Sequence, residues 1–314
     1  MLFLIILDII FLFFRSGEKM IVIKKITLGA ILALLFIGCT KAPITGRDQF
    51  IMINAQQEMQ LGLQSEKQIL QKERVSHDPQ KNAMVKRVGK RIAHIASSQY
   101  PTAKNFQWEF FVIDNDKEAN AFCLPGGKVF VYTGLFKYVA SDAELASVMG
   151  HEIGHALARH GAERMSRGQL AQVSGQVLQG IMVGQGNPQN TAAVMQAFGI
   201  GTQLGVMLPH SRTQEYEADH IGLVLMAKAG YNPNAALSFW DKFSKSGRTP
   251  PEYLSTHPAP RNRIETIKKL IPKVMPYYRG EARDKPNSLT NTKFNAPSSS
   301  RRSGGFIGSP IRAK

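Results

Sequence analysis

The chain has 314 residues, of which 43% are hydrophobic and 20% charged, and this is the balance of a globular protein long enough to bury a core. Its net charge of +16 permits contact with nucleic acid or an anionic membrane, but no zinc-finger pattern and no aromatic-plus-basic motif accompanies it, so we expect no nucleic-acid partner. The two cysteines, Cys39 and Cys123, exclude a disulfide-rich scaffold.

Residues 1–38 are predicted to be a targeting segment rather than part of the fold. Two apolar runs lie in this segment, and the second, Ile26–Ile37, follows the basic pair Lys24 and Lys25 in the manner of a signal peptide. Met20 stands just before this second unit and is an alternative start. Neither run reaches the roughly 20 apolar residues that a bilayer-spanning helix needs, although an uncleaved anchor or a hairpin of both runs is the alternative.

Cys39 directly follows this apolar run and Gly38, in an arrangement that resembles a bacterial lipobox. Cleavage there would make Cys39 the lipidated first residue of the mature protein. Because Thr40 rather than an aspartate comes next, we expect a lipoprotein of the bacterial cell envelope that is anchored to the outer membrane and faces the periplasm. Cys123 then has no intrachain partner, and we interpret it as a small buried hydrophobic residue rather than a nucleophile.

The first part of the mature chain contains two helical and two strand patterns. Asn54–Val75 and Asn82–Ala96 carry apolar residues at helical spacing, and Asn54 is suited to cap the first helix. Phe106–Ile113 and Val129–Thr133 are rich in aromatic and β-branched residues and predict strands. We interpret the polar residues 114–120 between them as a turn.

Ser141 begins the central predicted helix, which we expect to run to about Arg159. Ser141 and Glu144 have the spacing of a capping box, in which each side chain binds a backbone N–H at the helix start. The following region, Leu170–Leu208, is almost uncharged and rich in Gln, Gly, Met and Val, and we predict helices that are broken near residues 184–188. Three interpretations of this region stay open: a lid over the site, a membrane-facing surface, or ordinary buried helices.

Further helices are predicted at Thr213–Ala229, from Pro233 onward and at Arg263–Ile271. From Arg279 the chain is rich in Ser, Asn, Gly, Pro and basic residues, which predicts a disordered tail. We therefore divide the chain into the targeting segment, a folded domain at residues 39–278 and a basic tail at residues 279–314.

The central helix carries His151-Glu152-Ile153-Gly154-His155, an H-E-x-x-H motif. Residues four apart lie on one face of a helix, so both imidazoles can bind one ion, and Glu152 can reach a water bound to that ion. The motif alone is a weak signal and is compatible with a polar surface helix. The capped helix start and the apolar residues on the other faces of the helix strengthen the functional interpretation.

A catalytic zinc needs a third protein ligand and an open position. Glu215 and Asp219 lie four residues apart on another predicted helix, so we predict Glu215 as the third ligand and Asp219 as the acceptor for the outer N–H of a ligand histidine. We interpret Glu217 as a surface or structural carboxylate. The sequence therefore predicts one Zn²⁺ per chain, held by His151, His155 and Glu215.

Several segments together resemble metallopeptidase family forty-eight, the gluzincins that include the integral CAAX prenyl proteases, the mitochondrial Oma-type peptidases and the periplasmic BepA-like and LoiP-like peptidases. The matching segments are Pro43–Arg47, Asn120–Phe122, Pro125–Gly127, Tyr132–Gly134, His151–His155, Ser211–Arg212, Glu215–Asp219, Gly222, Thr256–Pro258 and Arg263–Ile264. This resemblance covers nearly the whole mature chain, and the lipoprotein start places the chain nearer the soluble members.

The resemblance implies an α+β, mainly α-helical zincin-like (gluzincin) fold with a small β-sheet or hairpin next to the active-site helix. It implies zinc at the ligands already chosen. It also implies that His257, on a loop, approaches the metal as a fourth ligand or a catalytic group, and the alternative is that His257 only caps a helix. His210 stands where relatives often have a tyrosine, and we interpret His94, His160 and His220 as surface residues.

The predicted chemistry is hydrolysis of peptide bonds. Zinc would polarise the scissile carbonyl and acidify water, and Glu152 would act as the general base that takes the water's proton and passes it to the leaving amine. We predict that Lys128, Val129, Phe130 and Val131 lie at a sheet edge near the cleft, where an extended peptide would pair with their backbone. Ordinary sheet structure is the alternative for this strand.

We therefore expect a metalloendopeptidase that acts on misfolded or misassembled envelope proteins, with a lipid anchor in the membrane and contacts to envelope assembly machinery. The second hypothesis is a lipid-anchored chaperone whose uncharged segment Leu170–Leu208 binds unfolded proteins. The third is an integral membrane protease that keeps its N-terminal spans.

Overall fold

The computed structural model describes residues 39–184, 188–203, 207–245 and 263–280. The predicted targeting segment, the predicted loop that carries His257, and residues 281–314 of the predicted tail lie outside these residues. Among the described residues, no helix combines the length and hydropathy that crossing a membrane requires.

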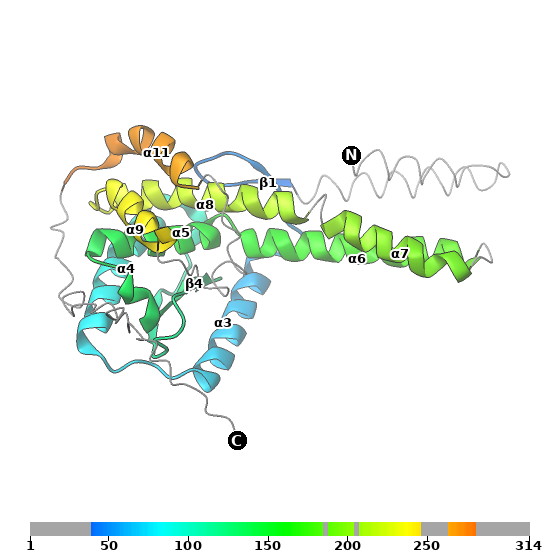
Figure 1. The fold of residues 1–314 in the computed structure, drawn as a ribbon, viewed down its shortest axis with the longest axis horizontal. Helices are drawn as coiled ribbons and strands as arrows, with labels where there is room; N and C mark the ends of the chain where they lie inside the picture. The colour runs from blue at the N-terminus through cyan, green and yellow to red at the C-terminus, as the bar shows by residue number, and fades with distance from the viewer. Residues whose placement is uncertain (1–38, 185–187, 204–206, 246–262, 281–314) are drawn as a thin grey trace, which may run out of the picture.

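Helices make up most of the structure, and the strands form two small sheets (Figure 1). The elements in chain order are β1 (Cys39–Lys41), β2 (Asp48–Phe50), α3 (Ala55–Lys72), α4 (Pro79–Gln99), β3 (Glu109–Ile113), β4 (Ala121–Leu124), β5 (Lys128–Tyr132), α5 (Asp142–Leu157), α6 (His160–Gly184), α7 (Pro188–Thr202), α8 (Leu208–Lys228), α9 (Asn234–Lys245) and α11 (Arg263–Val274), with short 3-10 turns at Pro101–Ala103, Thr133–Lys137 and Met275–Tyr277. This confirms the mainly helical α+β architecture that the sequence predicts.

The central helix α5 is buried along its whole length and packs against α4, α8, α9 and β4. A helix that is apolar on nearly all sides can be stable only in such a position. Ser141 caps it, because its hydroxyl accepts a hydrogen bond from the Glu144 N–H at 3.3 Å. The reciprocal half of the predicted capping box differs: the Glu144 carboxylate binds the N–H of Ala140 at 2.6 Å, one residue before the cap.

The larger sheet has the order β3-β5-β4, with β5 parallel to β3 and antiparallel to β4. The prediction that Lys128, Val129, Phe130 and Val131 form an open edge is therefore wrong, because β5 is paired on both sides. Val129 and Val131 pack into the main core, whereas Phe130 and Tyr132 pack on the opposite face of the sheet. A continuous apolar run is the pattern of a strand buried on both faces, which is a central strand.

The edge beside α5 is β4, a strand that the sequence analysis did not predict. It lies directly after the predicted polar turn and before Pro125. Phe122 of β4 stacks on Phe130 of β5, which stacks in turn on Phe111 of β3, with ring centroids 4.9 Å apart in each pair. This aromatic row is covered by Ile69 and Leu70 of α3. The row fixes β4 between α3 and α5.

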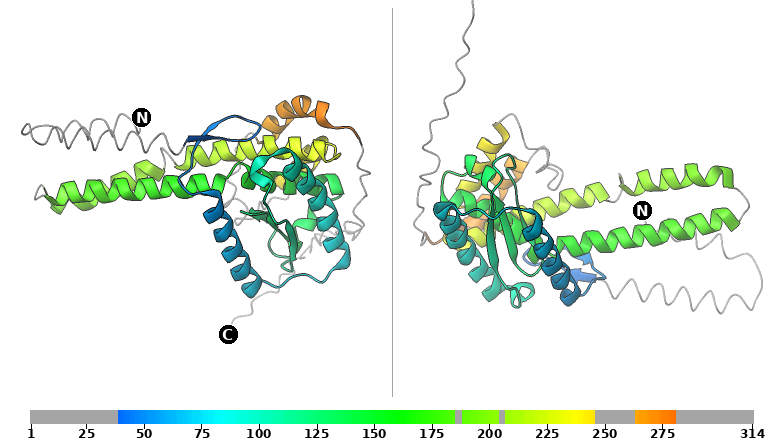
Figure 2. Two further views of the ribbon diagram at one scale, coloured as in Figure 1. Left: turned by 180° about the vertical axis from the view of Figure 1, so that it is seen from behind. Right: turned by 90° about the horizontal axis from the view of Figure 1, so that it is seen from below.

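Helices α6 and α7 form a hairpin that projects from the body of the molecule (Figures 1 and 2). The two helices pack against each other at Gly175 of α6, where a β-carbon would lie 3.4 Å from side-chain atoms of Met195 and Phe198 on α7. Val173, Val177 and Ile200 are each more than half exposed. The interpretation of this region as ordinary buried helices is therefore wrong for the projecting part of the hairpin.

Candidate active site

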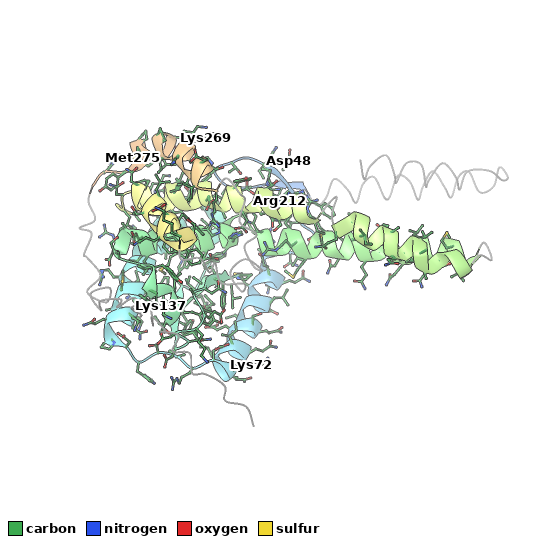
Figure 3. The ribbon with its side chains drawn as sticks, in the orientation of Figure 1. Asp48, Lys72, Lys137, Arg212, Lys269 and Met275 are labelled. Carbon is green, nitrogen blue, oxygen red and sulfur yellow. The ribbon has the colours of Figure 1, made fainter. Side chains whose placement is uncertain are left out.

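Charge is distributed unevenly between the surface and the interior. Lys72, Lys137 and Lys269, which are labelled in Figure 3, are all exposed. The three acidic residues of α8 near its middle are at most 5% exposed; they are Glu215, Glu217 and Asp219. Buried carboxylates need cationic or hydrogen-bonding partners, so this interior cluster is the place to look for a site.

His151 and His155 of α5 meet Glu215 of α8, as predicted. The Nε2 atoms of the two imidazoles are 3.1 Å apart, and each lies 3.3 Å from a different oxygen of the Glu215 carboxylate. Every pair of these ligand atoms is within 4.8 Å, and all three residues are buried. Among the described residues, this is the one group of three or more such side chains with the geometry of a metal site.

The hydrogen bonds behind the imidazoles show that this group fits a cation. His151 Nδ1 lies 2.9 Å from Asp219 Oδ1, and because a carboxylate only accepts, we assign the proton to Nδ1. His155 Nδ1 lies 2.8 Å from His160 Nδ1, and His160 Nε2 lies 3.0 Å from a Glu217 oxygen, so His160 donates to Glu217 and accepts from His155. Both Nε2 atoms then face Glu215 as electron-pair donors, which is the arrangement a divalent metal requires.

Asp219 has the predicted place behind His151, and it is joined there by Arg263, which the sequence analysis did not assign to the site. The Arg263 Nη2 lies 2.6 Å from Asp219 Oδ1 and 2.9 Å from His151 Nδ1, and its Nη1 lies 3.7 Å from a Glu215 oxygen. Its guanidinium carbon is 3.7 Å from the ring centroid of Trp240. Arg263 begins α11, so α11 brings a positive charge to the carboxylates of Glu215 and Asp219 on α8.

The pKa values follow from these neighbours. Burial and the Arg263 guanidinium lower the pKa of His151, but the carboxylates of Asp219 and Glu215 outweigh them and raise it to about 9. Burial lowers the pKa of His155 well below its ordinary value. The carboxylates therefore favour one positive charge at His151, whether a proton or a metal ion carries it.

Glu152 lies at a cleft beside the metal ligands. The cleft has a volume of about 510 Å³, and its lining comes from α3, β4, the Pro125 turn, α5 and the start of α6. Glu152 and His155 of α5 line it, opposite Phe122 and Cys123 of β4. Burial and the neighbouring Glu152 raise the pKa of the Cys123 thiol far above its ordinary value, which disfavours a nucleophilic thiolate, but Cys123 lines the cleft and is only partly buried rather than buried as interpreted.

One residue near the site, His160, differs from the sequence-based interpretation, and for a second, Glu217, the structure decides between the two alternatives. His160 was interpreted as a surface residue, but it is completely buried and lies between His155 and Glu217. Glu217 is a structural rather than a surface carboxylate, at 5% exposure. The H-E-x-x-H spacing could not indicate His160, because His160 lies beyond the end of α5, where Arg159 adopts a left-handed φ of 52° and separates α5 from α6.

Comparison with known proteins assigns this site to a family. Residues 79–271 match the model described as "Peptidase family M48". The chain belongs to peptidase family M48. It is a metalloendopeptidase, and its matched region contains both helices that carry the ligands.

The chain is similar to several M48 metalloendopeptidases. It is 31% identical to the mitochondrial metalloendopeptidase OMA1 of Saccharomyces cerevisiae, over 84% of this chain and 80% of that protein. It is 39% identical to the OMA1 of Arabidopsis thaliana over 56% of this chain, and 32% identical to the beta-barrel assembly-enhancing protease of Escherichia coli over 80% of this chain. The chain covers 33% and 52% of the lengths of these last two proteins.

Proposed function

We propose that this M48 chain is a zinc-dependent endopeptidase that acts on proteins of the bacterial cell envelope. The observation that carries the proposal is the convergence of His151, His155 and Glu215 beside a cleft that Glu152 and His155 line. Two imidazoles and one carboxylate, with space left for a further ligand, are the donor set of catalytic zinc sites in hydrolases.

The residues of the chain divide the chemistry between them. When bound, zinc supplies Lewis-acid chemistry, which polarises a carbonyl and acidifies water. Glu152 takes the proton of the attacking water and passes it to the leaving amine. Asp219 and His160 hold the two imidazoles by their outer nitrogens, so that both Nε2 atoms face the same point.

The substrate peptide is proposed to bind along β4 rather than β5. β4 is the outer strand of its sheet, and Phe122, Cys123 and Leu124 line the cleft next to Glu152. An extended peptide that pairs with an edge strand gains affinity from its backbone and leaves side-chain choice loose.

The β4 proposal predicts a dependence on the peptide backbone. N-methylation of single amides near the scissile bond, with the side chains unchanged, should raise KM by about tenfold at alternate positions, because each lost hydrogen bond costs about 1–2 kcal/mol. A scan of methylated peptides in a cleavage assay measures this. Uniform cleavage of all methylated peptides would show that the substrate does not pair with an edge strand.

The envelope location is supported by the sequence rather than by the fold. Cys39, at the end of the lipobox-like sequence, begins β1, so acylation there would place the body of the enzyme directly at a membrane surface. The relative in Escherichia coli is named for β-barrel assembly, whereas other relatives are mitochondrial. The intact mass of protein extracted from host membranes tests the lipidation: cleavage and acylation at Cys39 give one mass, and a retained N-terminal segment gives a larger one.

A non-enzymatic role, that of a lipid-anchored chaperone, is the second candidate. It is favoured by the α6–α7 hairpin, which carries exposed valines and has no Asp, Glu, Lys or Arg between Arg167 and Arg212. Such a surface suits unfolded polypeptides, which also expose apolar side chains.

Metal removal separates the two candidates. Treatment with a chelator should abolish cleavage of an unfolded protein such as casein, and added Zn²⁺ should restore it, because the Lewis-acid chemistry is lost with the metal. Suppression of client aggregation should be measured in the same samples. Cleavage that persists in metal-free protein would refute the zinc peptidase, and aggregation suppression that survives chelation would support the chaperone.

A further inference from the structure

The two histidine ligands are supported from opposite ends of the chain. His151 is backed by Asp219 and by Arg263 of α11. His155 is backed by His160 at 2.8 Å, and His160 by Glu217 at 3.0 Å. The series of contacts from His155 through His160 continues beyond Glu217.

Glu217 is held by two residues of the segment that follows β1. Arg47 donates from Nε to Glu217 Oε2 at 2.8 Å, and its Nη2 lies 2.7 Å from the same oxygen. The Thr45 hydroxyl donates to Oε1. Both oxygens of this buried carboxylate are therefore fixed by the β1–β2 hairpin, which lies over α8 in Figures 1 and 2.

The direction of these hydrogen bonds matters for the metal. Arg47 can only donate, so Glu217 is held as an acceptor, and it accepts from His160 Nε2. His160 Nδ1 is then left to accept from His155 Nδ1, and His155 presents its Nε2 lone pair to Glu215. If Glu217 were lost, His160 would be free to rotate or to change tautomer, and the orientation of His155 would no longer be fixed.

We infer that Arg47, Glu217 and His160 are positioning residues for the metal ligand His155. The N-terminal β1–β2 hairpin then helps to orient a metal ligand through Arg47. This inference rests on the proposed zinc site. The hairpin ends before residue 79, where the match to the family model begins.

Arg47 also has a purely structural contact, and this contact provides a matched control. Its Nη1 and Nη2 bind the two oxygens of Glu163 on α6 at 2.9 and 2.7 Å. Glu163 is as buried as Glu217, but its hydrogen bonds go to the side chains of Arg47, Gln49, Arg167 and Gln214 rather than to His155 or His160. Burial raises the pKa of Glu163, and Arg47 with Gln214 outweighs burial and lowers it to about 2, so Glu163 is a charged partner of Arg47 too.

The test compares Glu217→Gln with Glu163→Gln. Each removes one buried carboxylate from Arg47, but only Glu217→Gln changes the group that accepts from His160, because an amide oxygen is a weaker acceptor and the amide NH₂ can turn toward His160 Nε2. Zinc affinity is measured by competition with a chromogenic chelator. The geometry of the metal ligands is measured by the visible absorption of the Co²⁺-loaded protein. We expect Glu217→Gln to weaken zinc binding by about 10-fold and to change the Co²⁺ spectrum, which is the lower end of the effect of losing a direct partner of a ligand histidine, because Glu217 acts through His160. We expect Glu163→Gln to lower the midpoint of thermal unfolding and to leave both metal readouts unchanged.

Arg47→Lys keeps the fold testable if Glu217→Gln does not fold. It retains a positive charge beside both carboxylates but loses the planar fork, so a smaller weakening of zinc binding is expected. Lys41→Gln removes a positive charge from the same hairpin, where Lys41 pairs with exposed Asp48. This variant should leave the zinc affinity and the Co²⁺ spectrum unchanged. Wild-type metal affinity and an unchanged Co²⁺ spectrum in both Glu217→Gln and Arg47→Lys would overturn the inference. Failure of the wild-type protein to bind either metal would instead overturn the zinc site, and the inference with it.

Discussion

Replacing Glu152 with glutamine is expected to remove peptide hydrolysis and to leave the metal bound. Glutamine has nearly the same shape and can still line the cleft, but it cannot accept a proton from water. Proton transfer by a positioned side chain contributes about 10²-fold to 10⁴-fold, so kcat should fall by that factor. KM should change little, because Glu152 is not proposed to hold the peptide. Cleavage kinetics together with the zinc content of the purified variant measure both parts of the prediction.

Glu144→Gln is the control for this prediction. Glu144 lies on the same helix and is also buried, at 6% exposure, but it binds the N–H of Ala140 and Lys242 Nζ rather than lining the cleft. Its substitution should lower stability and leave kcat unchanged. A Glu152→Gln enzyme with wild-type kcat would refute the general-base role of Glu152. It would not contradict the proposed metal site.

The sequence predicts the metal site well because the information is local. Helical periodicity places His151 beside His155, and Glu215 beside Asp219, without knowledge of the fold. The meeting of the two helices followed from chemistry, since a catalytic metal needs a third ligand. The distance of 3.3 Å from each imidazole to Glu215 confirms that step.

The remainder of the site depends on contacts that no local pattern encodes. Arg47 and Glu217 are 170 residues apart in the sequence. His160 faces the site because Arg159 takes a left-handed conformation that is uncommon for a residue other than glycine. Arg159 is held there by Glu58 Oε2 at 2.6 Å and by the Ile53 carbonyl at 2.7 Å, both from the N-terminal part of the fold. Tertiary contacts therefore determine this turn, and the sequence around it does not signal it.

Sheet order was mispredicted for a related reason. The apolar run from Val129 to Tyr132 was correctly interpreted as a strand, but its neighbours depend on pairing with distant segments. The run itself indicates a central strand rather than an edge strand, because successive residues that are all apolar indicate burial on both faces. An edge strand with one face toward a cleft is shorter and less regular, as Ala121–Leu124 is.

Replacing Gly222 with alanine is expected to weaken both the fold and the metal site. Gly222 of α8 lies against α5 so closely that an added β-carbon would be 2.7 Å from the His151 backbone nitrogen and 2.8 Å from the Gly150 carbonyl carbon. Both are backbone atoms and cannot rotate away. Gly150 has the reciprocal contact, with its own added β-carbon 2.9 Å from the Gly222 carbonyl oxygen. The two helices therefore touch through their backbones at the level of the first metal ligand.

A methyl group at this contact must separate α5 from α8, and the metal ligands are divided between these two helices. Overpacking of a close-packed core costs about 1–3 kcal/mol, so the midpoint of chemical unfolding of the metal-free protein should fall accordingly. Because metal–ligand distances tolerate only about 0.2 Å, the displacement of Glu215 from the imidazoles should also weaken zinc binding. Gly180→Ala, at a position in α6 where an added β-carbon meets nothing within 4 Å, should instead stabilise the protein by about 0.5–1 kcal/mol and leave zinc affinity unchanged. If Gly222→Ala lowered stability but bound zinc as tightly as the wild type, the spacing of α5 and α8 would not be what holds Glu215 in place.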